Sequence, residues 1–156
     1  MTDNLNELYR DIIMDHYKYP RHRHKLDSPD ITSEGKNPVC GDEIEMTLKI
    51  DGDQRIVDVG VECAGCAISV ASGSMLSDIV NGKSLLEVKE IARTVKAILK
   101  GEEVIDSSLD LGDLESLKGV RKFPVRIKCA LLSWTALVDA IESFEKGANT
   151  ARVTTE

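Results

Sequence analysis

The chain has 156 residues, of which 42% are hydrophobic and 30% are charged, and its formal net charge is −7. Its length suits one domain with a substantial core. The acidic balance excludes nucleic acid as the main partner, because phosphate binding needs a surplus of lysine and arginine. No apolar run approaches the ~20 residues of a membrane span, and the first residues lack a signal pattern. We therefore expect a cytoplasmic protein without a membrane partner.

Apolar spacing predicts one helix and then three strands in the first half of the chain. Helical spacing marks the helix, and a proline ends it. Apolar and polar residues alternate along two of the strands, which a glycine-containing turn joins into an antiparallel hairpin with one apolar face. The predicted elements are a helix from Leu5 to Tyr17 and strands over 31–36, 43–50 and 57–63. The apolar face of the last strand is expected to carry Val57, Val59, Val61 and Cys63.

Capping patterns predict three further helices in the second half. Glycines end them, a serine and a glutamate three residues apart cap one, and a proline begins the last. The predicted helices span about 67–81, 85–100 and 124–146, with a loop over 102–113 and a helical turn at 114–118. We predict one domain over residues 1–147, followed by a flexible C-terminal tail over 148–156, which has no core-forming pattern.

Three cysteines and an aspartate are the candidate metal ligands. Cys40, Cys66 and Cys129 come from a loop, a strand–helix junction and a helix start, so only the tertiary fold can bring them together. Thiolates bind soft metals such as zinc and iron, and cysteines of a cytosolic chain favour metal or sulfur chemistry over disulfides. Asp42 follows Cys40 across Gly41, whose backbone freedom lets both side chains face one ion. An oxygen ligand leaves such a site more exchangeable than a fourth thiolate would.

Local charge favours the thiolate form at two of these cysteines. Cys66 and Cys129 are expected in or near the first turn of a helix, where free N–H groups stabilise negative charge. Arg126 and Lys128 flank Cys129 and should lower its pKa further. The alternative is that each cysteine is a small buried hydrophobe, which is less consistent with glycine, aspartate or cations beside all three.

Other candidate ligands have simpler explanations. Cys63 forms a C-x-x-C pair with Cys66, but the strand pattern favours a buried structural cysteine over a spare ligand or a resolving thiol. His22 and His24 lie in a basic cluster over residues 18–25, where metal binding is the minor alternative. This basic cluster is interpreted either as a solvated loop or as a docking patch for an acidic surface.

The candidate segments resemble the SufU branch of the IscU/NifU-type iron–sulfur assembly proteins. The resemblance rests on residues 37–42 (NPVCGD), 65–72 (GCAISVAS) and 119–134 (GVRKFPVRIKCALLSW), and it covers roughly residues 5 to 145. Lys128 stands where IscU-type scaffolds carry a histidine, and the stretch 100–119 resembles an insertion of SufU-type chains. Both features point to the SufU branch.

This resemblance implies an α+β fold with a small antiparallel three-stranded sheet packed with helices. It implies zinc held by Cys40, Asp42, Cys66 and Cys129. The implied function is a zinc-dependent sulfurtransferase that takes persulfide sulfur from a PLP-dependent cysteine desulfurase of the SufS type and serves the downstream iron–sulfur assembly machinery. Cys40 would accept the sulfur, and Arg126 would stabilise the developing charge or pair with Asp42.

Two alternatives stay open at this point. The chain could be a scaffold that builds an iron–sulfur cluster on the same cysteines, although Lys128 removes one ligand expected for that role. It could instead be a non-catalytic binding module that zinc stabilises. Whether the chain is an enzyme depends on which of the three functions is correct.

Overall fold

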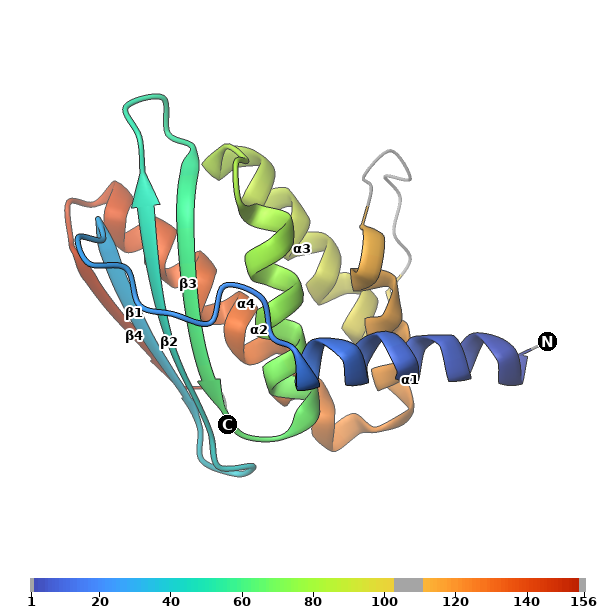
Figure 1. Cartoon of the computed structure of the whole chain (residues 1–156). Coiled ribbons are helices and arrows are strands. Elements are labelled where there is room, and N and C mark those ends of the chain that lie inside the picture. The colour runs from blue at the N-terminus through green and yellow to red at the C-terminus, as the bar shows by residue number, and fades with distance from the viewer. Residues whose placement is uncertain (1, 103–110, 155–156) are drawn as a thin grey trace.

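A four-stranded sheet with helices on one face forms the computed structural model, which describes residues 2–102 and 111–154 (Figure 1). Helices α2 and α4 pack on the sheet, α3 packs on α4, and α1 crosses the end of α2. The elements are α1 (Thr2–Lys18), β1 (Ile31–Asn37), β2 (Asp42–Ile50), β3 (Ile56–Ala64), α2 (Ala67–Val80), α3 (Leu85–Lys100), the 3-10 helix η1 (Gly112–Lys122), α4 (Pro124–Glu145) and β4 (Thr150–Thr154).

The sheet has the strand order β3-β2-β1-β4, with β4 parallel to β1 and the other pairs antiparallel. This confirms the α+β class and the predicted antiparallel strands. The prediction of three strands was one too few, and the prediction of a flexible tail is wrong for residues 150–154. The five residues of β4 are mostly polar and only Val153 packs against the core, so their pattern gave no strand signal.

The inner faces of β2 and β3 follow the predicted alternation except at one position. Met46, Leu48 and Val59 are fully buried, as expected. Val57 was placed on the same apolar face, but it is 48% exposed, because the register shifts beside Ile50 and brings Ile56 into the core instead. A β-bulge of this kind inserts one residue and breaks strict alternation.

The predicted helix boundaries in the second half are confirmed. Ser84 and Glu87 form both hydrogen bonds of a capping box at the start of α3, and Gly101 ends the helix with a φ of 74°. The helical turn expected at 114–118 is part of the longer η1. The predicted loop lies mostly outside the described residues.

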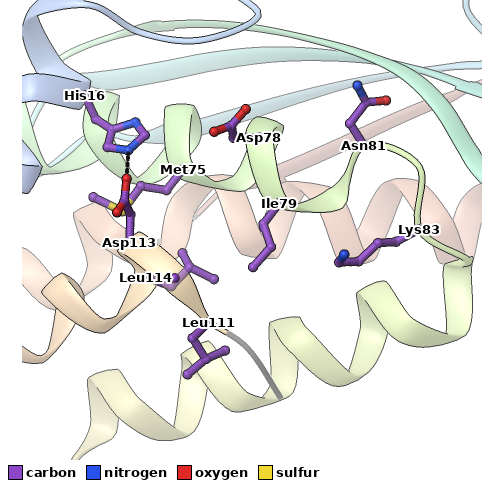
Figure 2. A pocket seen from close by; sticks show the side chains of 10 residues that line it. His16, Met75, Asp78, Ile79, Asn81, Lys83, Leu111, Asp113 and Leu114 are labelled. Atoms are coloured by element: carbon purple, nitrogen blue, oxygen red, sulfur yellow. Dashed lines mark hydrogen bonds and ion pairs between the residues drawn. The ribbon is translucent and has the colours of Figure 1, made fainter. Parts of the chain in front are cut away.

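Helix α1 is fixed to the rest of the fold through a buried histidine (Figure 2). His16 is 1% exposed, and its two ring nitrogens lie 2.8 Å from Ser74 Oγ of α2 and 2.8 Å from Asp113 Oδ2 of η1. This contact lies beside a surface pocket of about 340 Å³. None of the cysteines lines that pocket, so it is separate from the candidate ligands.

Candidate metal centre

The fold brings three of the four predicted ligands to one point. Cys40 lies in the turn between β1 and β2, Asp42 is the first residue of β2, and Cys129 lies in the second turn of α4. One ligand atom from each lies within 4.8 Å of the others. Two thiols and a carboxylate form a donor set that suits zinc.

Cys66 meets this cluster through its backbone. It is the N-cap residue of α2, and its N–H donates to Asp42 Oδ1 at 2.9 Å. Its thiol is not within 4.8 Å of all three other ligand atoms, so the structure groups Cys40, Asp42 and Cys129 without it. A fourth bond from Cys66 to a metal therefore stays a prediction and requires its side chain to turn toward the others.

The Asp42 carboxylate has an unused oxygen that suits a metal ion. Asp42 is 1% exposed, and its Oδ2 is buried without a hydrogen-bond partner. Burying such an oxygen is costly unless a partner satisfies it. A bound cation beside Cys40 and Cys129 would supply that partner, so the residues present fit a metal site.

The two clustered thiols contact each other. Cys129 Sγ donates to Cys40 Sγ at 2.9 Å, and all four cysteines are free, since a disulfide would hold its sulfurs about 2.05 Å apart. Burial is the main cause that raises the pKa of Cys129, and the neighbouring Cys40 and Asp42 side chains raise it further. The prediction that local charge lowers this pKa is wrong, because Cys129 is fully buried beyond the first helical turn and the loss of solvation outweighs the flanking charge. A bound cation would favour the Cys129 thiolate and would lower this pKa.

Arg126 is the cation of the site. Its guanidinium is exposed, and interaction with the Cys129 sulfur first, and then with those of Cys66 and Cys40, raises the pKa of Arg126. Arg126 therefore lies close enough to interact with all three predicted thiol ligands. It is the exposed group best placed to stabilise negative charge that develops on these sulfurs.

Two residues with a structural role at the site were not singled out from the sequence. Asn37 is fully buried, and its Nδ2 donates to Cys129 Sγ at 3.7 Å. Gly65 has a φ of 152°, and a Cβ there would overlap the Asp42 carboxylate, lying 2.8 Å from its Cγ. The available signal was their place inside the motif segments, since each stands within three residues of a cysteine.

Cys63 lies outside the cluster. It is half-buried, its Sγ lies 3.5 Å from Ser69 Oγ, and burial raises its pKa to about 11. A thiol held protonated in this way is a poor nucleophile at neutral pH. These features support the structural interpretation of Cys63.

The basic cluster over residues 18–25 makes several contacts within the chain. Arg21 lies 2.7 Å from Asp15, Lys25 lies 3.1 Å from Glu45, and His22 pairs with Asp78 at 3.7 Å. These ion pairs favour the solvated loop over the docking patch. Among the residues that the structure describes, the histidines of this segment belong to no group of metal ligands.

A thiol and carboxylate metal site on a small sheet with helices on one face defines a cysteine-based metal- or sulfur-handling protein. The family model for the NifU-like N-terminal domain matches residues 8–151, so the chain belongs to this family. The predicted resemblance is thereby confirmed. Within the described residues, no helix has both the length and the apolar character needed to cross a membrane.

Two curated relatives cover nearly the whole chain. The zinc-dependent sulfurtransferase SufU of Bacillus subtilis is 45% identical over 144 residues, which are 92% of this chain and 96% of the relative. The iron–sulfur cluster assembly scaffold protein IscU of Streptococcus pyogenes is 41% identical over 150 residues, which are 96% of this chain and 91% of the relative. The chain is therefore similar to proteins of both named functions.

Solved structures share the fold. FiSufU of the SUF system of Fervidobacterium islandicum AW-1 superposes with a TM-score of 0.78 and 35% identity, over 84% of this chain and 94% of that one. The N-terminal part of a NifU-like protein from Brucella abortus gives a TM-score of 0.80 at 23% identity, over 90% of this chain and 96% of that one. At that identity the second match supports the fold alone.

Proposed function

We propose that this chain is a zinc-dependent sulfurtransferase of iron–sulfur cluster assembly that takes persulfide sulfur from a PLP-dependent cysteine desulfurase of the SufS type. One observation carries the proposal: ligand atoms of Cys40, Asp42 and Cys129 lie within 4.8 Å, with Asp42 Oδ2 buried and unpartnered. The 45% identity to a zinc-dependent sulfurtransferase supports the same function. We place the protein in the cytosol, where the downstream assembly machinery would act.

Zinc would be held by Cys40, Asp42 and Cys129, with Cys66 as the fourth ligand. When bound, it supplies a positive charge that favours thiolates and shields them from oxidation. Asp42 is oriented by the Cys66 N–H through Oδ1, which leaves its buried Oδ2 without a hydrogen-bond partner and available to a metal. The chain thereby fixes the carboxylate before any metal binds.

Cys40 is the thiol best placed to meet a partner. It is only half-buried, and its neighbour Val39 is 71% exposed, whereas Cys129 is fully buried. The Cys40 thiolate would attack the terminal sulfur of the partner's persulfide. A new S–S bond then forms on Cys40, the donor S–S bond breaks, and the partner's cysteine leaves as a thiolate. Arg126 would stabilise negative charge during this exchange.

The surface around the site offers an apolar docking area. Phe123 is 57% exposed and Val125 67% exposed at the start of α4, close to Arg126. A groove of about 450 Å³ opens beside them between α1, α2 and η1. Exposed apolar patches of this kind mark protein contacts, which supports docking of the desulfurase here rather than on the basic cluster.

The test measures how strongly this protein stimulates turnover of a SufS-type desulfurase. Cys40→Ala should abolish stimulation, because the acceptor sulfur is missing. Cys63→Ala is the matched control and should retain most of it, since Cys63 lies outside the cluster. Full stimulation by Cys40→Ala would overturn the assignment of the acceptor.

The second candidate function is a scaffold for an iron–sulfur cluster on the same residues. The 41% identity to an IscU scaffold favours it, while Lys128, exposed beside Cys129, offers no ligand in place of a histidine. Metal analysis of the purified protein separates the candidates. About one zinc per chain without sulfide is expected for the sulfurtransferase, and iron with acid-labile sulfide is expected for the scaffold. Zinc without any stimulation of the desulfurase would indicate the non-catalytic binding module.

A further inference from the structure

Two buried side-chain atoms lack hydrogen-bond partners within the described part of the chain, and both lie at the metal centre. One is Asp42 Oδ2, which a metal would satisfy, and the other is Asn37 Oδ1. Asn37 and Asp42 are directly paired at the end of the β1–β2 hairpin. A half-satisfied buried amide is costly, so Asn37 needs a role that an apolar side chain would not fill.

The other half of the Asn37 amide points at a sulfur. Its Nδ2 donates to Cys129 Sγ at 3.7 Å, although the two residues are 92 positions apart in the chain. Sulfur is an acceptor here, which accounts for the amide presenting its N–H₂ group rather than its oxygen. The contact joins the last residue of β1 to α4.

The sulfurs of Cys129 and Cys40 differ in the nitrogen donors that contact them. Asn37 Nδ2 donates to Cys129 Sγ, and the Arg126 guanidinium lies near the same sulfur. Within the described residues, Cys40 receives only the S–H of Cys129. An N–H donor draws charge from a sulfur and makes it less nucleophilic, so Cys129 is the damped sulfur and Cys40 the reactive one.

We propose that Asn37 is a positioning residue that holds Cys129 as the permanent ligand of the metal centre, so that Cys40 is the thiol that exchanges. The proposal rests on the zinc site of the proposed function, but it does not depend on which protein donates sulfur. It assigns a role to a side chain whose one polar contact among the described residues is with a ligand sulfur.

The experiment compares zinc affinity, measured by competition with a chelator, in the wild type and in Asn37→Leu and Asn37→Asp. Both substitutions keep the branching of asparagine and its number of side-chain heavy atoms, and both remove the N–H donor. Loss of such an outer contact should weaken zinc binding by roughly 10–100-fold. Ser33→Ala is the matched control, because Ser33 is fully buried on the same face of β1 but bonds to the Ala136 carbonyl instead of a sulfur. Its zinc affinity should stay at the wild-type value.

Thiol labelling identifies which sulfur is affected. Brief treatment of the zinc-loaded wild type with iodoacetamide should label Cys40 before Cys129, as mapped by peptide mass spectrometry. The Asn37 variants should shift labelling toward Cys129, while Ser33→Ala should keep the wild-type order. This ratio does not follow from a general loss of stability, which would expose both thiols.

Unchanged zinc affinity and labelling order in both Asn37 variants would overturn the proposal. The proposal would also be overturned if Ser33→Ala lost as much zinc affinity as the Asn37 variants. The same holds if the Asn37 substitutions lowered the melting temperature equally with and without zinc, because Asn37 would then be a purely structural residue. A wild type that binds zinc but does not stimulate the desulfurase would contradict the proposed function and leave these comparisons of zinc affinity intact. A wild type that binds no zinc would overturn both.

Discussion

The β1–β2 turn and helix α4 each supply one thiol to the same site, but they hold it in opposite ways. Cys40 is half-buried in a turn beside exposed Val39, whereas Cys129 is fully buried in a helix packed on β1 and β4. One site therefore combines a fully buried thiol with a more accessible one, and the proposed division into a fixed half and an exchangeable half rests on this difference. The carboxylate of Asp42 stands between them, fixed by one oxygen and open at the other.

Removal of zinc should have the largest effect and should act unequally on the two halves. A ligand at 1,000 times its dissociation constant adds about 4 kcal/mol to stability, so excess chelator should lower the melting temperature by roughly 8–16 °C. Amide hydrogen exchange should rise in the turn over residues 38–41 and stay low around Cys129. Equal changes of amide protection in the turn and in α4 would contradict the proposed difference between the two thiols.

Gly65→Ala should damage the carboxylate between the two halves. A Cβ at this position would overlap Asp42, and the φ of 152° disfavours a side chain. We expect zinc affinity to fall by roughly 10–100-fold, measured by chelator competition. Gly52→Ala is the control, because a Cβ there meets nothing within 4 Å, and its affinity should match the wild type. A Gly65→Ala variant with wild-type affinity would show that Asp42 need not be held in place.

Cys63 lies outside the site, and its titration should have the smallest effect on stability. Burial raises its pKa from the usual 9.0 to about 11, so the folded state prefers the protonated thiol. The corresponding stability is present below about pH 9 and is lost as the pH rises through 11, amounting to at most about 3 kcal/mol. Urea unfolding of the wild type and of Cys63→Ala over this range should show the extra loss only in the wild type. Parallel pH profiles would mean that the Cys63 thiol is not desolvated.

Local signals made much of the fold predictable. The Ser84 and Glu87 capping box and the alternation of β2 depend on near neighbours in the chain, and both formed as expected. Strand β4 was missed, because its few polar residues become a strand only by pairing with distant β1. Val57 was misplaced, because a single bulge changes which residues face the core.

The site was predictable as a set of residue types and not as a geometry. Cys40 and Asp42 are near in sequence, so their shared direction followed from the motif. The contact between Asn37 and Cys129 spans 92 positions, and the clash that requires Gly65 appears only once Asp42 is placed in space. The raised pKa of Cys129 likewise depends on burial, which flanking cations do not reveal.

The most direct test of the account locates the transferred sulfur. The zinc-loaded protein is incubated with a SufS-type desulfurase and cysteine, persulfides are trapped by alkylation, and peptides are mapped by mass spectrometry. We expect one additional sulfur atom on the peptide that carries Cys40 and none on Cys129 or Cys63. Sulfur found first on Cys129 or Cys63 would contradict the division into a fixed and an exchangeable half.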